Sequence, residues 1–171
     1  MKKFKIICFV VTLIFACSLV SIIVTIRNDM NLTESNTSEY TATISSILLS
    51  SNDANSNAVI ITNEYACALY LKRDILENQE ILKQLQNLTR DQQIVFRIPE
   101  GETELLNSAG FVTIVALEEK TTCIFSLTDY NNCMRVTMRP MLITSFFAEA
   151  LFILGAILFG RSIFFKKEKK N

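Results

Sequence analysis

The chain contains no histidine and no tryptophan, and only four glycines and two prolines among its 171 residues. Without histidine, Ser-His and Cys-His nucleophile pairs cannot form, and the commonest transition-metal ligand is missing. The sequence also lacks the phosphate-binding motifs G-x-x-x-x-G-K-[ST] and G-x-G-x-x-G and the redox motif C-x-x-C. These absences argue against most enzymes, so we expect no enzymatic activity, no cofactor and no bound metal.

The formal net charge is zero, but the charges are unevenly distributed along the chain. Residues 1–5 carry three lysines and no acid, and residues 161–171 carry five Lys or Arg against one Glu. Residues 27–140 hold nine basic and fifteen acidic side chains. An acidic segment is poorly suited to displacing counterions from phosphates, so we expect no nucleic-acid partner.

Two long apolar runs stand near the ends of the chain. The first, residues 6–26, has 21 residues without a charge, and a helix of that length rises ~31 Å, the thickness of the hydrocarbon core. The second, residues 140–165, begins with a proline, which suits the first turn of a helix. We therefore expect an integral membrane protein with two transmembrane helices.

Basic tails flank both apolar runs on the side of the chain ends, at residues 1–5 and 166–171. The positive-inside rule predicts that both tails are cytoplasmic and that residues 27–139 lie on the far side of the cell membrane. The protein is then a multi-pass protein, and the lipid bilayer is one of its partners.

A processed N-terminus is the alternative for the first run. Residues 14–17, Ile-Phe-Ala-Cys, resemble a lipobox, so the run could be a lipoprotein signal that ends at Cys17. However, nine further residues of the same apolar character follow Cys17, whereas a processed lipoprotein opens with a polar tether. The run is also long for a secretory signal, and no A-x-A site follows it. We expect an uncleaved anchor.

One acidic residue, Glu149, interrupts the second run about eight residues, or ~12 Å, below its outer edge. Ser18 and Ser21 lie at a comparable depth in the first run, so a neutral Glu149 could donate a hydrogen bond to either. Ala156 and Gly160 form a small-xxx-small pair, which allows helices to approach closely. These five residues are the candidate helix-association site, because two spans cannot enclose a transport path.

The middle segment alternates between apolar and polar residues, which is typical of half-buried strands. The clearest example is residues 93–98, where Ile94, Phe96 and Ile98 share one face. The pattern predicts an amphipathic helix over 74–88 and a further helical turn over 128–138. The other predicted strands are residues 40–49, 58–62, 66–71, 111–117 and 122–127, with a hairpin turn at 118–121.

Three strands, a helix and then two or three strands is the element order of an OB-type barrel. Residues 92–98 (QQIVFRI), placed after the helix, look like the fourth strand of such barrels. The whole layout resembles uncharacterised two-pass membrane proteins of Gram-positive bacteria with a small extracytoplasmic β domain, and that resemblance implies no catalytic residues. The expected fold is α+β, with two transmembrane helices flanking a mainly-β domain, an OB-like barrel or an open sheet, that carries one prominent helix.

Three cysteines fall in the middle segment, Cys67, Cys123 and Cys133, so they can form at most one disulfide among themselves. Cys67 and Cys123 take apolar positions of their predicted strands, which favours buried thiols. A bridge from Cys67 or Cys133 to Cys123 is the alternative. The acidic stretch 100–104 lacks the spacing of a calcium loop, and we expect it to be solvated.

The leading functional hypothesis is a non-enzymatic binding or assembly module whose outer domain contacts another membrane or envelope protein, or a ligand. The second is a small accessory subunit that acts through its transmembrane helices, with Glu149 contacting a larger complex. The third is an enzyme that uses carboxylates alone. The first two hypotheses differ in which part of the chain suffices to hold the partner.

Overall fold

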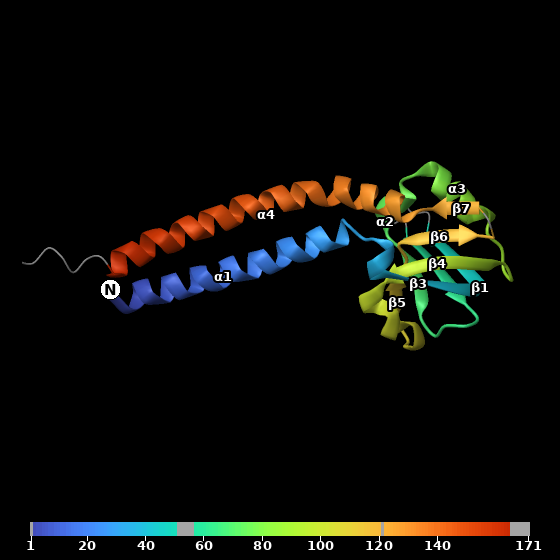
Figure 1. Cartoon of the computed structure of the whole chain (residues 1–171), viewed down its shortest axis with the longest axis horizontal. Coiled ribbons are helices and arrows are strands. Elements are labelled where there is room, and N and C mark those ends of the chain that lie inside the picture. The colour runs from blue at the N-terminus through green and yellow to red at the C-terminus, as the bar shows by residue number, and fades with distance from the viewer. Residues whose placement is uncertain (1, 51–56, 121, 165–171) are drawn as a thin grey trace, which may run out of the picture. The chain divides into compact units, whose positions relative to one another are not determined.

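The computed structural model of the chain describes residues 2–50, 57–120 and 122–164. The chain forms two compact units, one of residues Met30–Val136 and one of the segments Met1–Asp29 and Thr137–Asn171. Figure 1 shows a unit built on a β-sheet and a pair of long helices. The fold class is α+β, as the sequence predicts.

The helical unit consists of α1 (Lys2–Asp29) and the C-terminal part of α4 (Leu127–Phe164). Among the described residues, two segments are long and apolar enough to cross a membrane, Phe9–Asp29 and Leu127–Leu158. α4 continues through Pro140, so the helical turn predicted over 128–138 and the second apolar run belong to one helix.

The seam between the two helices follows heptad spacing. Side chains that are not exposed include two series that recur every three or four positions: Phe9, Thr12, Ala16, Leu19, Ile23 and Ile26 of α1, and Leu142, Ser145, Glu149, Phe152 and Ala156 of α4. The helices run antiparallel, because Phe15 stacks on Phe152 at 5.5 Å while Gly160 lies against Phe9. A 3.5-residue repeat is the geometry of left-handed helix packing.

The second unit is built on a seven-stranded mixed sheet with the order β5-β3-β2-β1-β4-β6-β7. All neighbouring strands are antiparallel except β3 and β5, which are parallel. The strands are β1 (Thr37–Ser50), β2 (Asn57–Thr62), β3 (Ala68–Leu71), β4 (Gln93–Pro99), β5 (Phe111–Thr113), β6 (Ala116–Glu119) and β7 (Thr122–Phe125).

The central strand β1 serves both halves of the sheet. Its first half pairs with β4, from Thr37 to Thr43, and its second half pairs with β2. The register with β2 shifts between Ile44 and Ser46, which marks a β-bulge. Because a bulge adds one residue to one strand, the side chains that follow it change faces.

The predicted OB-like barrel is wrong, because the sheet is open and its edge strands β5 and β7 do not pair. The segment predicted as one strand, residues 111–117, is divided between the two halves. Ile114 N donates to Tyr70 O of β3, while Val115 N donates to Arg97 O of β4. Residues 111–117 are therefore divided into β5 and β6 at Ile114 and Val115, both fully buried, and each of these two residues is bonded to a different half of the sheet.

The predicted helix over 74–88 is two helices, α2 (Arg73–Leu76) and α3 (Gln79–Asn87). The break falls at Asn78, whose side-chain oxygen accepts a hydrogen bond from Glu80 N at 3.0 Å. Asparagine is a strong helix N-cap, so this residue starts a new helix rather than extending the first. The described residues of the unit also form two short 3-10 helices, η1 (Glu34–Asn36) and η2 (Glu100–Asn107).

The ends of the sheet-containing unit are joined by an amide side chain on α4. Asn131 Oδ1 accepts from Leu32 N at 3.0 Å, and Asn131 Nδ2 donates to Leu32 O at 2.7 Å. On the same helix, Tyr130 and Met134 are buried in the core of the unit. The first turns of α4 are therefore part of the sheet-containing unit.

Phe96→Asp should prevent this unit from folding. Phe96 is 1% exposed and its ring contacts Tyr40 and Tyr65, with centroids 6.0 and 5.8 Å apart. The lost packing and the buried charge should together cost at least ~4 kcal/mol, comparable to the whole stability of a small domain. Gln93→Asp, on the exposed face of the same strand, should stay within ~0.5 kcal/mol of the parent. Near-ultraviolet circular dichroism and protease resistance in detergent would show whether each variant is folded. A folded Phe96→Asp variant would contradict the assignment of Phe96 to the core.

Candidate binding surface

One outer face of the sheet is apolar. After the bulge, the register places Leu48, Val59, Tyr70 and Thr113 side by side across β1, β2, β3 and β5. The neighbouring row consists of Ser46, Ile61, Ala68 and Phe111. Leu48 is 59% exposed, Ile61 37% and Phe111 67%. We call Leu48, Val59, Ile61, Tyr70 and Phe111 the apolar face.

A hollow of about 390 Å³ lies on the apolar face, lined by Asn57, Val59, Tyr70 and Phe111. The rings of Tyr70 and Phe111 meet edge to face with centroids 6.4 Å apart. Tyr70 Oη donates to Asn57 Oδ1 at 3.1 Å, which holds the tyrosine ring as one wall. The hollow is therefore a largely apolar depression with one amide and one hydroxyl group at its border.

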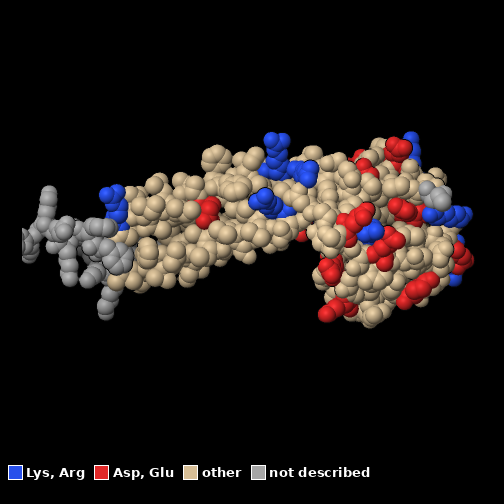
Figure 2. Space-filling view, in the orientation of Figure 1, with Lys and Arg blue, Asp and Glu red and all other residues tan. Residues whose placement is uncertain are grey.

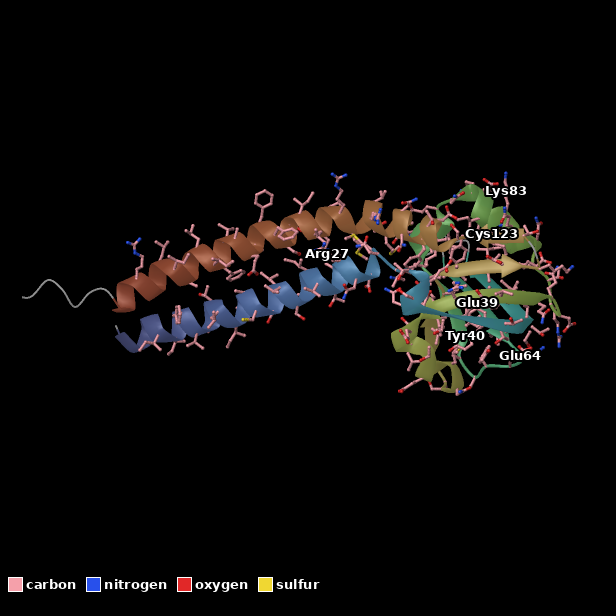
Figure 3. All side chains as sticks on the ribbon, in the orientation of Figure 1. Arg27, Glu39, Tyr40, Glu64, Lys83 and Cys123 are labelled. Carbon is pink, nitrogen blue, oxygen red and sulfur yellow. The ribbon has the colours of Figure 1, made fainter. Side chains whose placement is uncertain are left out.

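The outer face on the other half of the sheet is polar by contrast. Arg97 pairs with Glu39 across β4 and β1, with a nitrogen–oxygen distance of 2.7 Å. Thr41 and Glu118 are exposed on the same face. Figure 3 labels Glu39 on β1 and Cys123 on β7 in this region. Because ion pairs and hydroxyl groups are well solvated, this half of the sheet requires no cover, whereas the apolar face leaves hydrophobic side chains in water.

A second hollow, of about 300 Å³, lies between the α2–α3 region and the first turns of α4. Its polar lining includes Asp129 and Asn78, and both side chains cap helices. Asp129 Oδ2 accepts from Ser126 N at 2.8 Å, and Asn78 Oδ1 accepts from Glu80 N at 3.0 Å. Both groups therefore have a structural role. Among the residues that the structure describes, no group of three or more Cys, Asp or Glu is arranged to hold a metal.

The candidate helix-association residues lie in the helical unit. Glu149 faces the seam, and its Oε2 atom is buried with no hydrogen-bond partner among the described residues. The packing of Gly155 on Thr12 and of Phe152 on Phe15 puts Glu149 close to the level of Ser18. The Ser18 hydroxyl, however, donates to Ile14 O of its own helix at 3.0 Å.

The remaining members of that candidate site take different positions along the helices. Ser21 is exposed, and its carbonyl oxygen accepts from Thr25 Oγ1 at 3.1 Å. Ala156 lies in the seam, and Gly160 lies against the ring of Phe9. Gly155, which the sequence analysis did not single out, also lies in the seam, where an added Cβ would be 3.7 Å from Thr12 Cγ2. The sequence offered one signal for this position, a glycine inside the second apolar run next to Ala156.

Cys67, Cys123 and Cys133 are all free thiols. Cys67 is buried, as its apolar position predicts, and burial raises the pKa of its thiol. Cys123 is exposed, because the register between β6 and β7 shifts beside it and turns it to the outer face. Partial desolvation and then the nearby carboxylates of Glu118 and Asp129 raise the pKa of the Cys123 thiol.

In single-thiol variants of the folded protein, we expect a maleimide to label Cys123 and to label Cys67 only after denaturation. The thiolate is the reacting form, so the raised pKa should make Cys123 slower than a free cysteine at neutral pH, and its rate should rise as the pH increases. Glu118→Gln removes one of the charges that raise the pKa and should speed the reaction. Mass spectrometry of timed samples measures each rate, and equal labelling of Cys67 and Cys123 would contradict the assigned faces.

Sequence reasoning did not find the apolar face. The run Ile47-Leu48-Leu49 is apolar at three successive positions, so alternation alone does not say which side chain points outward. The bulge determines which of these side chains points outward, and the sequence of Ile44–Ser46 contains no signal that predicts a bulge. Comparisons of the chain with protein families, with curated proteins and with solved structures found no match.

Proposed function

We propose that the chain is a two-span protein of the cell membrane that works as a non-enzymatic binding module. In this proposal both termini are cytoplasmic and Met30–Val136 lies on the far side of the bilayer. The basic tails and the acidic segment between the spans support this orientation. The heptad seam supports an uncleaved first helix, because removing α1 would leave its half of the seam empty. Labelling of Cys123 on intact cells with a membrane-impermeant maleimide tests whether Met30–Val136 lies on the side of the membrane away from the cytoplasm.

The observation that carries the binding proposal is the apolar face. Exposed contiguous hydrophobic side chains on a folded domain mark interaction sites, whereas isolated ones do not. Here they occupy two adjacent rows across four strands and border a hollow. Aromatic residues such as Tyr70 and Phe111 are also the side chains that contribute most to protein interfaces. We propose that another membrane or envelope protein covers this face.

The other described features support binding rather than catalysis. The chain has no histidine, and two of the polar side chains that line the hollow beside α4, Asp129 and Asn78, cap helices. The apolar hollow offers no carboxylate, thiol or amine among its four lining residues. Such a surface can pack a partner's side chains but has no group for proton or group transfer.

A photocrosslinking residue at position 48 should capture another polypeptide in native membranes. Leu48 and Thr41 are both exposed residues of β1, but Leu48 lies on the apolar face and Thr41 on the polar face. Thr41 is therefore the matched control and should give little or no product. Gel analysis and mass spectrometry would measure the products. The absence of a product at Leu48, or equal products at both positions, would contradict the proposal.

A second candidate function rests on Glu149. A carboxyl oxygen enclosed without a hydrogen bond is costly in hydrocarbon, and intramembrane acids commonly contact other helices. Glu149 as a residue is only half-buried, so part of its side chain is reachable from outside the seam. The chain would then be an accessory subunit whose helices join a larger membrane complex.

Glu149→Gln should preserve this association and Glu149→Leu should weaken it. The amide keeps the shape and a hydrogen-bond donor, whereas leucine removes a bond worth ~1–2 kcal/mol in a membrane, or about tenfold in affinity. Ala150→Leu, on the exposed side of the helix, is the control. Co-purification from mild detergent measures the association. If Glu149→Gln abolished the cellular phenotype while association persisted, the titratable proton itself would be required.

A further inference from the structure

The apolar face is bordered by an acidic segment. η2 (Glu100–Asn107) has the sequence EGETELLN, with three glutamates and no basic residue, and it packs beside β5. Glu102 Oε2 accepts a hydrogen bond from Thr113 N of β5 at 2.8 Å. Glu100 and Glu104 are exposed on the same segment. Negative charge therefore lies beside β5, the strand that carries Phe111, the most exposed side chain of the apolar face.

Glu102 also restricts how a partner can approach. β5 is an edge strand, and edge strands offer unpaired N–H groups to an added strand. The Thr113 N–H group is already bonded to Glu102, so β5 is blocked for strand addition at that residue. A partner is therefore expected on the face of the sheet, over the hollow, rather than in line with β5.

The net charge of the sheet-containing unit favours some partners over others as the molecule that covers the apolar face. Residues 30–136 contain fourteen Asp and Glu against seven Lys and Arg. In Figure 2 most of the acidic groups in view lie on the sheet-containing unit. A second copy of the chain would bring the same excess of negative charge to the contact, whereas a cationic partner would be attracted and would associate faster.

We infer that the occupant of the apolar face is a cationic amphipathic segment of another polypeptide. Its apolar side chains would pack on Tyr70 and Phe111 and fill the hollow, and its Lys or Arg side chains would lie toward Glu100 and Glu104. This inference rests on the proposed function, and it adds the charge and pattern of the partner.

The test uses the full chain in nanodiscs of zwitterionic lipid, with empty nanodiscs as the blank. The probes are two synthetic amphipathic helical peptides of equal length, one of leucine and lysine and one of leucine and glutamate. The leucine–lysine peptide should bind, and the leucine–glutamate peptide should bind at least about tenfold more weakly. Binding of the leucine–lysine peptide should also weaken as salt is added.

Two variants separate the apolar and the acidic contributions. Phe111→Ser should lower the affinity for the leucine–lysine peptide by about tenfold or more, as expected when an exposed aromatic anchor is removed. The double change Glu100→Gln and Glu104→Gln should lower the affinity for the same peptide several-fold and reduce the salt dependence of its binding. The matched controls are Val95→Ser, on the polar outer face, and the double change Glu80→Gln and Glu118→Gln, away from η2. These controls should bind as the parent does.

The inference is overturned if the two peptides bind equally, or if the Glu80 and Glu118 changes weaken binding as much as the Glu100 and Glu104 changes. If the crosslink at Leu48 joins two copies of this chain, or identifies a partner segment without basic residues, the charge assignment fails while the apolar face remains a docking site. If Leu48 gives no crosslink and Phe111→Ser binds as the parent does, the proposed function itself fails.

Discussion

The β-bulge in the middle of β1 is the constraint on which the sheet-containing unit depends. β1 has 14 residues, and of the strands that the structure describes it is the only one that belongs to both halves of the sheet. With a regular strand, Leu48 would share the inward face with Ile44, and Ile47 would point to solvent. The extra residue reverses this, so that Ile47 lies opposite Ile60 and Leu48 opposite Val59. The bulge thereby fixes both the core of that half and the apolar face outside it.

The core of the unit is completed by segments that interrupt regular structure. Ile114 and Val115 leave the strand pattern and fill the space between the halves, each bonded through its backbone to a different half. Asn78 starts α3 where the sequence pattern continues as one helix, and Glu102 caps an N–H group of β5. In each case a single polar bond or a division of a strand interrupts a local periodic pattern.

These interruptions of regular structure explain which features of the fold could be predicted from the sequence and which could not. The two long apolar helices and the strands with strict alternation were predicted correctly, since Gln93–Pro99 buries Ile94, Phe96 and Ile98 on one face as expected. The barrel was wrong because residues 111–117 are divided into two strands of an open sheet, and nothing in the sequence of that segment marks the division. Cys123 is exposed rather than buried because the register slips beside it. The candidate binding surface required the three-dimensional register, since Leu48, Tyr70 and Phe111 are far apart in the chain.

The pair of hydrogen bonds between Asn131 and Leu32 has an architectural consequence. The chain enters and leaves the sheet-containing unit at one point, because residues 99 positions apart are held together there. A domain of this kind behaves as an insertion whose termini already lie next to each other. Such a domain can be exchanged as a single unit between two antiparallel helices, so the apolar face can change in sequence while the two helices keep their own packing.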